Sequence, residues 1–424
     1  MGLLHRRNMA AAAAAAAVPD WVMVESFVFR RDDAASFRED NRTSAASVTS
    51  TGAPFRVSFL LAEPPTPSRL YISFPEGPEH GVACYLLAAH CNLVLFRVDC
   101  IIPRPGEVGP PSPFNRTLQD YFVYTPGSCH MRAFDHPGVG LLCHGAEEFT
   151  VAYLIVLTCP ETSVFDAQLW LLRSSVQSPG GEEWEVKEVP IHYDANDDEQ
   201  CDDLFWWTTN EAVPFKNSLC WACYGRGVLI CDNLHGDIPK VSYLPFPKKT
   251  FRCNAPYQGR MELYRSLCVT GGGQQLELAD VARADVKAVG PMAPSTGFTL
   301  TTWRLANNEN GGLQWVHSRT ISSDEFWGQN NPEQLPHEVM MLPLLSMDEP
   351  NVLHTVLYDW APDVPKFSLV TIGLEGRKAL TPVVPYIRGV EDLSGDDADM
   401  VRAKPYFFMH FLATEFPKFL HVDR

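Results

Sequence analysis

Short apolar segments alternate with polar turn clusters along most of the chain, which favours β-strands over helices. The segments are rich in β-branched and aromatic side chains, and several end at Pro or Gly. The clearest lie at residues 56–61, 92–98, 120–124, 151–157 and 169–172. Helical periodicity is scarce. The best candidate, residues 333–341, contains Pro336 and predicts one short helix at most.

One internal repeat begins at Ser218. The residues Ser218-Leu219-Cys220, Gly225 and Asp232 recur 48 residues later as Ser266-Leu267-Cys268, Gly273 and Asp280. Both copies predict a strand, a glycine turn, a second strand and an acidic residue. We expect Gly225 and Gly273 to supply the positive φ that tight hairpin turns often require.

A second repeat is a pair of tryptophan hairpins. Trp170 is followed by Gly180-Gly181 and Trp184, and Trp303 is followed by Gly311-Gly312 and Trp315. In both copies a double glycine stands just before the second Trp, so a turn there would let the flanking strands pair.

These repeats predict an all-β chain. Units of about 40–50 residues are typical of propeller blades, and ring closure removes exposed sheet edges. The expected fold is therefore a β-propeller-like repeat of antiparallel sheets with about six to eight blades; two packed β-sandwich domains are the alternative. Residues 20–424 are expected to form one large domain, preceded by a disordered, Ala-rich segment at residues 1–19.

The segment 218–247 carries a recognisable signature. It contains Leu219 with Trp221, the turn Arg226-Gly227, an apolar strand ending at Asp232, and Leu244-Pro245-Phe246-Pro247. It resembles the plant family called domain of unknown function 1618, which is expanded in grasses, and residues 215–350 are the part most similar to it. One departure is Cys223, where the family pattern leads us to expect an acidic residue.

This resemblance implies no reaction, because the family has no assigned activity. The strand rhythm is also similar to that of the propeller-like domains that follow F-box motifs in plant ubiquitin-ligase adaptors. Unlike those adaptors, this chain shows no Leu-Pro-led helix bundle before Arg56.

Charge and cysteine usage restrict the classes of partner. The net charge of −17 and the absence of a basic stripe argue against nucleic acid. Several of the 12 cysteines lie in apolar runs, which is typical of buried thiols in a reducing compartment. No membrane span is expected, since the most apolar stretch, residues 149–159, is too short and predicts a buried strand. We expect a cytoplasmic or nuclear protein; the Ala-rich N-terminus leaves an organelle address open.

Two acidic segments, residues 194–203 and 391–399, are expected to be exposed loops, because clustered like charges resist burial. The first is not an EF-hand, since Glu199 and Phe205 stand where the loop glycine and the terminal Glu would be needed.

No catalytic, cofactor-binding or metal-binding residue is nominated. Gly-x-Ser-x-Gly is absent and the 13 histidines are dispersed. The leading hypothesis is a non-enzymatic scaffold that binds another protein. One alternative is a hydrolase with carboxylates around a central channel. Another is a thiol–metal site at Cys220, Cys223 and Cys231, although residues i and i+3 of a strand point to opposite faces.

Overall fold

The computed structural model of the 424-residue chain describes most of the sequence. The described residues are 18–33, 35–78, 82–102, 116–132, 138–145, 148–159, 164–174, 184–236, 238–247, 261–285, 287, 290–330, 335, 337–360, 366–380, 383–387, 395–402 and 410–420. Residues 1–17 of the Ala-rich segment and Gly180-Gly181 lie outside them.

The strands of these residues form six consecutive groups, here called blades 1 to 6. Blade 1 contains β1 (Val22–Arg30), β2 (Ala45–Val48), β3 (Pro54–Leu60), β4 (Ser68–Ser73) and β26 (Leu412–Thr414). Blade 2 contains β5 (Val82–His90), β6 (Leu93–Ile102), β7 (Arg116–Thr125) and β8 (Ser128–Arg132). Blade 3 contains β9 (Gly140–Cys143), β10 (Phe149–Cys159), β11 (Val164–Arg173) and β12 (Glu185–His192).

The second half of the chain repeats this plan. Blade 4 contains β13 (Glu211–Phe215), β14 (Ser218–Cys223), β15 (Gly227–Asp232) and β16 (Lys240–Pro245). Blade 5 contains β17 (Arg265–Thr270), β18 (Gln275–Arg283), β19 (Phe298–Asn307) and β20 (Leu313–Ser322). Blade 6 contains β21 (Met340–Leu345), β22 (Val352–Asp359), β23 (Lys366–Gly373), β24 (Lys378–Ala379) and β25 (Val384–Ile387).

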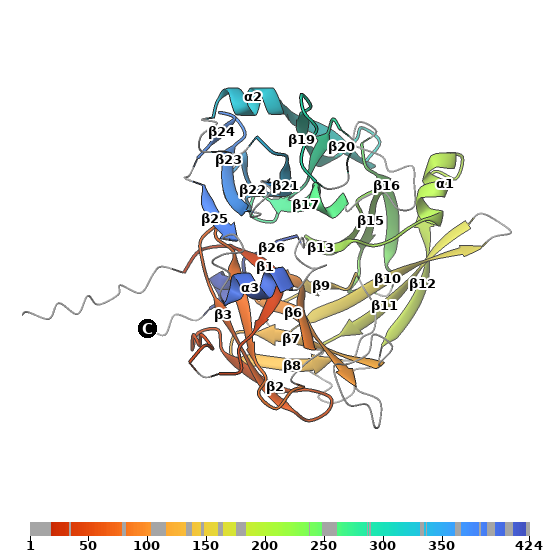
Figure 1. The fold of residues 1–424 in the computed structure, drawn as a ribbon. Coiled ribbons are helices and arrows are strands. Elements are labelled where there is room, and N and C mark those ends of the chain that lie inside the picture. The colour runs from red at the N-terminus through yellow and green to blue at the C-terminus, as the bar shows by residue number, and fades with distance from the viewer. Residues whose placement is uncertain are drawn as a thin grey trace, which may run out of the picture.

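The blades follow one another around a centre, as the colour order in Figure 1 shows. The first strand of each blade lies against the first strand of the next, from β1 through β5, β9, β13 and β17 to β21. Short stretches of strand pairing also connect blade 1 to blade 2, through β1 and β5, and blade 3 to blade 4, through β12 and β16. The all-β, propeller-like expectation is confirmed, and the number of blades in the described residues is at the lower end of the expected range.

The C-terminal part of the chain completes blade 1. Strand β26 pairs antiparallel with β1, with Val22 opposite Thr414 and Val24 opposite Leu412. Because β1 and β26 come from opposite ends of the chain, this pairing closes the ring, and such closure removes a free sheet edge. The short 3₁₀ helix η3 (Phe416–Phe419) follows and places Phe416 in the core of blade 1.

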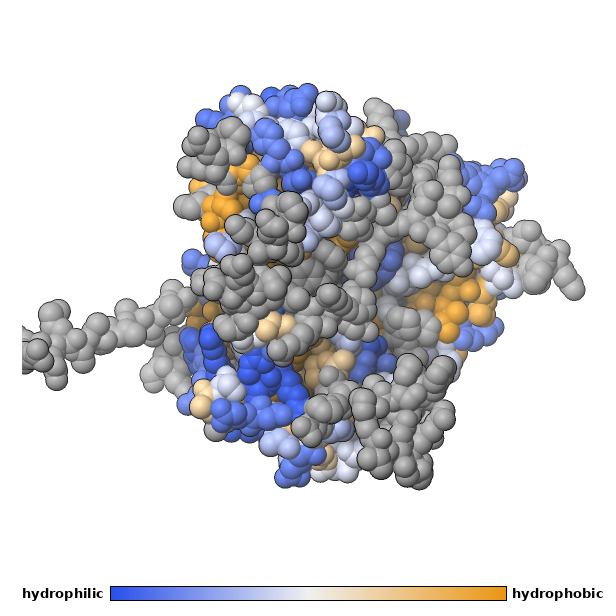
Figure 2. All heavy atoms as spheres, viewed as in Figure 1, coloured by the Kyte–Doolittle hydropathy of each residue, from blue (hydrophilic) through white to orange (hydrophobic). Residues whose placement is uncertain are grey.

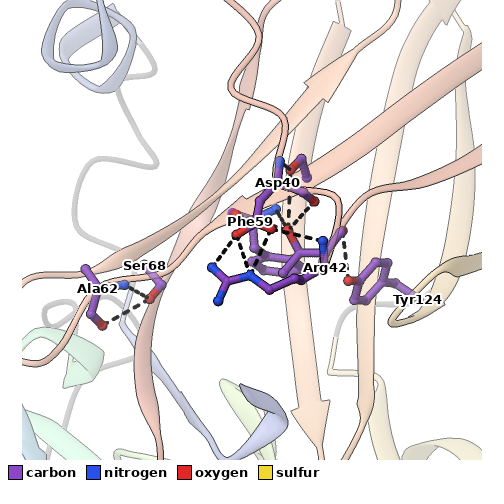
Figure 3. Close-up of polar contacts among 8 residues, drawn as sticks. Asp40, Arg42, Phe59, Ala62, Ser68 and Tyr124 are labelled. Atoms are coloured by element: carbon purple, nitrogen blue, oxygen red, sulfur yellow. Dashed lines mark hydrogen bonds and ion pairs between the residues drawn. The ribbon is translucent and has the colours of Figure 1, made fainter. Parts of the chain in front are cut away.

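The loop before β2 is held by a pair within itself and by a bond to blade 2 (Figure 3). The Arg42 guanidinium donates to the Asp40 carboxylate, with a shortest distance of 2.7 Å, and this pair is exposed. The Tyr124 hydroxyl, from blade 2, donates to the carbonyl oxygen of Thr43 at 2.9 Å. This second bond is buried, where an unpaired polar group would be costly.

Both copies of the Ser218 repeat are hairpins, as predicted. The registers differ by one residue, because Ser218 lies opposite Asp232 whereas Ser266 pairs with Ala279. The second turn is longer: Gly271, Gly272 and Gly273 all have positive φ there. The expectation for Gly225 was wrong, since its φ is not positive; the shorter turn closes by a bond from Arg226 N–H to the Cys223 carbonyl oxygen.

The tryptophan repeat also forms hairpins. Strands β11 and β12 pair around Trp170, and β19 and β20 pair around Trp303. Gly311 has a φ of +78°, which fits the predicted glycine turn. The five strands predicted from the sequence are β3, β6, β7, β10 and β11, although only the first half of β10 is largely buried.

Three short α-helices interrupt the strands in the described residues: α1 (Asp198–Phe205), α2 (Ser323–Gly328) and α3 (Asp396–Arg402). Helices α1 and α3 overlap the acidic segments 194–203 and 391–399, where exposed loops were expected, so that expectation was wrong for the described residues. Asp197 caps the N-terminus of α1 through the amides of Glu199 and Gln200, and carboxylates stabilise that end of a helix.

Helix α3 is acidic but paired. Asp396 accepts hydrogen bonds from Arg69 at 2.9 Å and from the Tyr71 hydroxyl at 2.6 Å, and Arg31 pairs with both Asp396 and Asp399. The partners all lie on or next to strands of blade 1. Partial burial of these carboxylates is therefore offset by cations that are far away in the sequence.

The prediction of a helix at residues 333–341 was wrong for those of its residues that the structure describes. Residues 337–339 are irregular and Met340 begins β21, because Met340, Met341 and their neighbours are fully buried in the core of blade 6. None of the helices in the described residues is long and apolar enough to cross a membrane.

Candidate interaction groove and central cavity

A groove lies between α1, the end of β16 and the start of β20. Its volume is about 260 Å³. It is lined by Asp197, Glu199, Gln200, Asp203, Leu244, Pro245, Phe246, Pro247, Leu313, Gln314 and Trp315. The Leu-Pro-x-Pro element of the sequence signature therefore forms one wall, and neighbouring blades contribute the others.

Helix α1 is fastened to blade 4 by the buried Asp203. The Asp203 carboxylate accepts hydrogen bonds from the Arg226 guanidinium at 3.1 Å and the Tyr243 hydroxyl at 2.8 Å. Burial raises the pKa of Asp203, and the Tyr243 and Arg226 contacts oppose that change. The next residue, Leu204, is fully buried in the blade core. These contacts give the groove a fixed wall.

The groove combines acidic and apolar surface. Asp197 and Glu199 stand on the α1 side, while Leu313 lies opposite with 38% of its surface exposed. The rings of Phe246 and Trp315, which line the same groove, lie 5.8 Å apart and join blade 4 to blade 5. A lining of carboxylates and aromatic rings suits a ligand that carries both positive charge and apolar groups.

Exposed aromatic residues continue from the end of α1. Phe205 and Trp206 are each 55% exposed, and their rings pack edge to face at 5.0 Å. Figure 2 shows hydrophobic residues gathered at one edge of the molecule, over the strands β10 to β12 and next to the hydrophilic surface of α1. Exposed apolar clusters bordered by charge are typical of contact surfaces for other molecules.

A second hollow lies at the centre of the ring. This cavity of about 250 Å³ is lined by residues of β5, β13, β17, β21 and β26, including His90, Glu211, Ser266 and Glu415. Two carboxylates thus face the channel region that the hydrolase alternative requires. Each of these carboxylates has a partner of its own. Glu415 pairs with Lys418 at 2.7 Å, and Glu211 lies 3.5 Å from His410 Nε2.

Glu211 belongs to a buried network that connects blades 4 and 5. The Tyr224 hydroxyl donates to Glu211 and accepts from the Leu267 amide at 3.0 Å. Burial, together with the Glu211 charge, raises the pKa of Tyr224 far above its ordinary value. Arg265 donates to the Tyr224 carbonyl oxygen and, at 2.7 Å, to Asp280. These bonds hold β13 and β17 together, which is a structural role.

The three cysteines of the thiol–metal hypothesis do not converge. Cys220 lies in the core between blades 4 and 5, whereas Cys231 lies in the core between blades 3 and 4. Burial raises the pKa of both thiols, to about 12 for Cys231. Cys223 is buried at the end of β14. In the described part of the chain, no group of three or more His, Cys, Asp or Glu residues is placed to hold a metal ion.

The part of the chain that contains these signature residues also matches the model of a known family. Residues 221–354 match the model of a family described as "Protein of unknown function (DUF1618)". This part of the chain is similar to the DUF1618 family. The matched residues cover blades 4 and 5 from Trp221 onward and the start of blade 6, and so they include every groove residue except those of α1 and its N-cap. No curated protein matches the chain.

The DUF1618 signature has a physical basis in this structure. Arg226 holds α1 through Asp203, Gly227 allows close approach of β16, and Leu244-Pro245-Phe246-Pro247 lines the groove. Sequence reasoning identified these residues but missed the groove. The usable signal was Asp197 followed by acidic residues, which is a helix start rather than a loop.

Proposed function

We propose that the chain is a non-enzymatic interaction module that binds a short, basic and apolar segment of a partner protein in the groove beside α1. The observation that supports this most is the lining of the groove, which combines acidic residues of α1 and its N-cap with the apolar residues Leu244, Phe246 and Leu313. A segment with Lys or Arg next to a large apolar side chain matches both surfaces.

The charge of the chain supports the same choice of partner. A net charge of −17 attracts basic segments and speeds their encounter with an acidic site. The apolar residues that line the groove then supply affinity, since buried aromatic contacts dominate most interfaces. The groove walls are held by buried bonds, so little ordering cost is expected on binding.

The proposal is tested by selecting random linear peptides on the immobilised full-length chain. Enriched peptides are expected to combine Lys or Arg with Phe, Trp or Leu, and their binding should weaken as salt concentration rises. Glu199→Lys should weaken the selected peptides about tenfold or more, because it reverses a charge on the groove wall. Leu313→Ala should also weaken them.

The matched control is Glu76→Lys, which makes the same charge change at an exposed turn of blade 1. It should leave peptide affinity unchanged apart from the general salt-sensitive attraction. Selection of no peptide family, or of peptides that bind Glu199→Lys as tightly as the parent chain, would refute the groove as the binding site.

A further inference from the structure

Two cysteine thiols meet where blades 2 and 3 adjoin. Cys91 stands in the turn between β5 and β6, and Cys143 is the last residue of β9. Strands β5 and β9 lie side by side. Both cysteines are partly exposed, whereas seven of the other eight free cysteines in the described residues are buried. Cys91 also lines the central cavity.

The contacts around the pair fix the position of Cys143. Its thiol is hydrogen-bonded to the Cys91 thiol, and its sulfur lies 3.0 Å from the carbonyl oxygen of Gly145. Its backbone N–H donates to His90 Nδ1 at 2.8 Å. His90 directly precedes Cys91, so these bonds hold β9 against the turn that carries the other thiol.

We propose that Cys91 and Cys143 form an oxidisable dithiol, whose disulfide would link blade 2 to blade 3 at the edge of the central cavity. The oxidant is a hydroperoxide, represented by hydrogen peroxide. Cys143 contacts both residues that flank Cys91, through its N–H to His90 and its sulfur 3.7 Å from Asn92 Oδ1, and this places the two sulfurs within reach of one bond. Partial exposure gives a small peroxide access to them.

The chemistry takes two steps. The Cys143 thiolate attacks one peroxide oxygen, the O–O bond breaks, and hydroxide leaves and is protonated to water, so that sulfur is oxidised to sulfenic acid. The Cys91 sulfur then attacks the Cys143 sulfur. The S–S bond forms, the S–O bond breaks, and the leaving hydroxide takes the Cys91 proton as water. Two thiols and one peroxide therefore give one disulfide and two waters.

The order of attack follows from the electrostatics of the pair. The hydrogen bond from Cys91 lowers the pKa of Cys143 to about 7, while the same bond and burial raise the pKa of Cys91. Because the thiolate is the nucleophile, Cys143 attacks the peroxide and Cys91 resolves the sulfenic acid.

The test treats the reduced full-length chain with one equivalent of hydrogen peroxide, blocks free thiols with N-ethylmaleimide, and maps links by mass spectrometry. A Cys91–Cys143 link that dithiothreitol removes is expected. Fragment spectra must separate Cys91 from Cys84, since no Lys or Arg lies between them. Cys201, also partly exposed, is the internal control and should remain blocked by maleimide.

Two variants test the order of events. In Cys91→Ser the reaction should stop at a sulfenic acid on Cys143 that dimedone traps, and in Cys143→Ser the residue Cys91 should stay reduced. The proposal is overturned if the parent chain gives no Cys91–Cys143 link, or if Cys201 oxidises as readily as Cys143.

Discussion

Single residues in this molecule show how burial changes the behaviour of a charge. Asp232 and Asp280 occupy equivalent places in the Ser218 repeat, yet Asp232 is exposed and bonds Ser218, whereas Asp280 is buried and bonds Arg265. Burial raises the pKa of Asp280, and the nearby guanidinium opposes this effect. The two copies of the repeat therefore carry the same residue type in different environments.

Glu25 is the clearest source of pH dependence. Burial raises its pKa to about 6, and it is 3% exposed and accepts a hydrogen bond from Tyr386. Since the folded pKa exceeds the unfolded one, this group stabilises the fold below about pH 4.5, and the contribution is lost as pH rises through about 6. The loss amounts to about 2 kcal/mol.

Glu25→Gln should remove that contribution. Urea unfolding at about pH 4 and about pH 7.5 should show the variant gaining about 2 kcal/mol relative to the parent chain at the higher pH. A difference between the two proteins that stays constant with pH would contradict this assignment.

At the level of elements, the strands were predictable and the groove was not. Short apolar runs rich in β-branched and aromatic residues predict β3, β6 and β7 from their own sequences. Helix α1 has one buried apolar residue, Leu204, and its other buried residue is Asp203. The partners that make this burial favourable, Arg226 and Tyr243, come from distant strands, so composition alone indicated a loop. The groove itself joins three segments that are far apart in sequence.

The turn of the first hairpin offers a matched pair of glycines. A Cβ at Gly227 would lie 2.5 Å from the Leu244 carbonyl oxygen and 2.7 Å from the Tyr243 ring, whereas one at Gly225 would meet nothing within 4 Å. Gly227→Ala should lower the free energy of unfolding by about 1–3 kcal/mol, and Gly225→Ala should change it by at most about 1 kcal/mol. Denaturant titration checks both, and equal effects would argue against the close approach.

At the scale of the whole molecule, stability depends on closing the ring. Strand β26 and helix η3 attach the C-terminal part of the chain to blade 1, and α3 reinforces the same attachment through Arg31 and Arg69. In a ring closed in this way the blades stabilise one another against unfolding, because separating one pair of neighbouring strands exposes two sheet edges.

Two phenylalanines of η3 test the closure. Phe416 is fully buried against Phe59, with ring centres 4.8 Å apart, whereas Phe419 is 42% exposed. Phe416→Ala should destabilise the whole chain by about 3–5 kcal/mol, and Phe419→Ala should cost about 0.5 kcal/mol or less. Thermal unfolding followed by circular dichroism separates the two, and similar midpoints would mean that this end does not close the ring.

The pairing of β1 with β26 also has a consequence for biosynthesis. β1 leaves the ribosome long before its partner β26, because most of the described strands lie between them in the sequence. Until then the first sheet carries unsatisfied amides and carbonyls that invite wrong pairing. Chaperone dependence of the nascent chain should therefore persist until β26 has been synthesised.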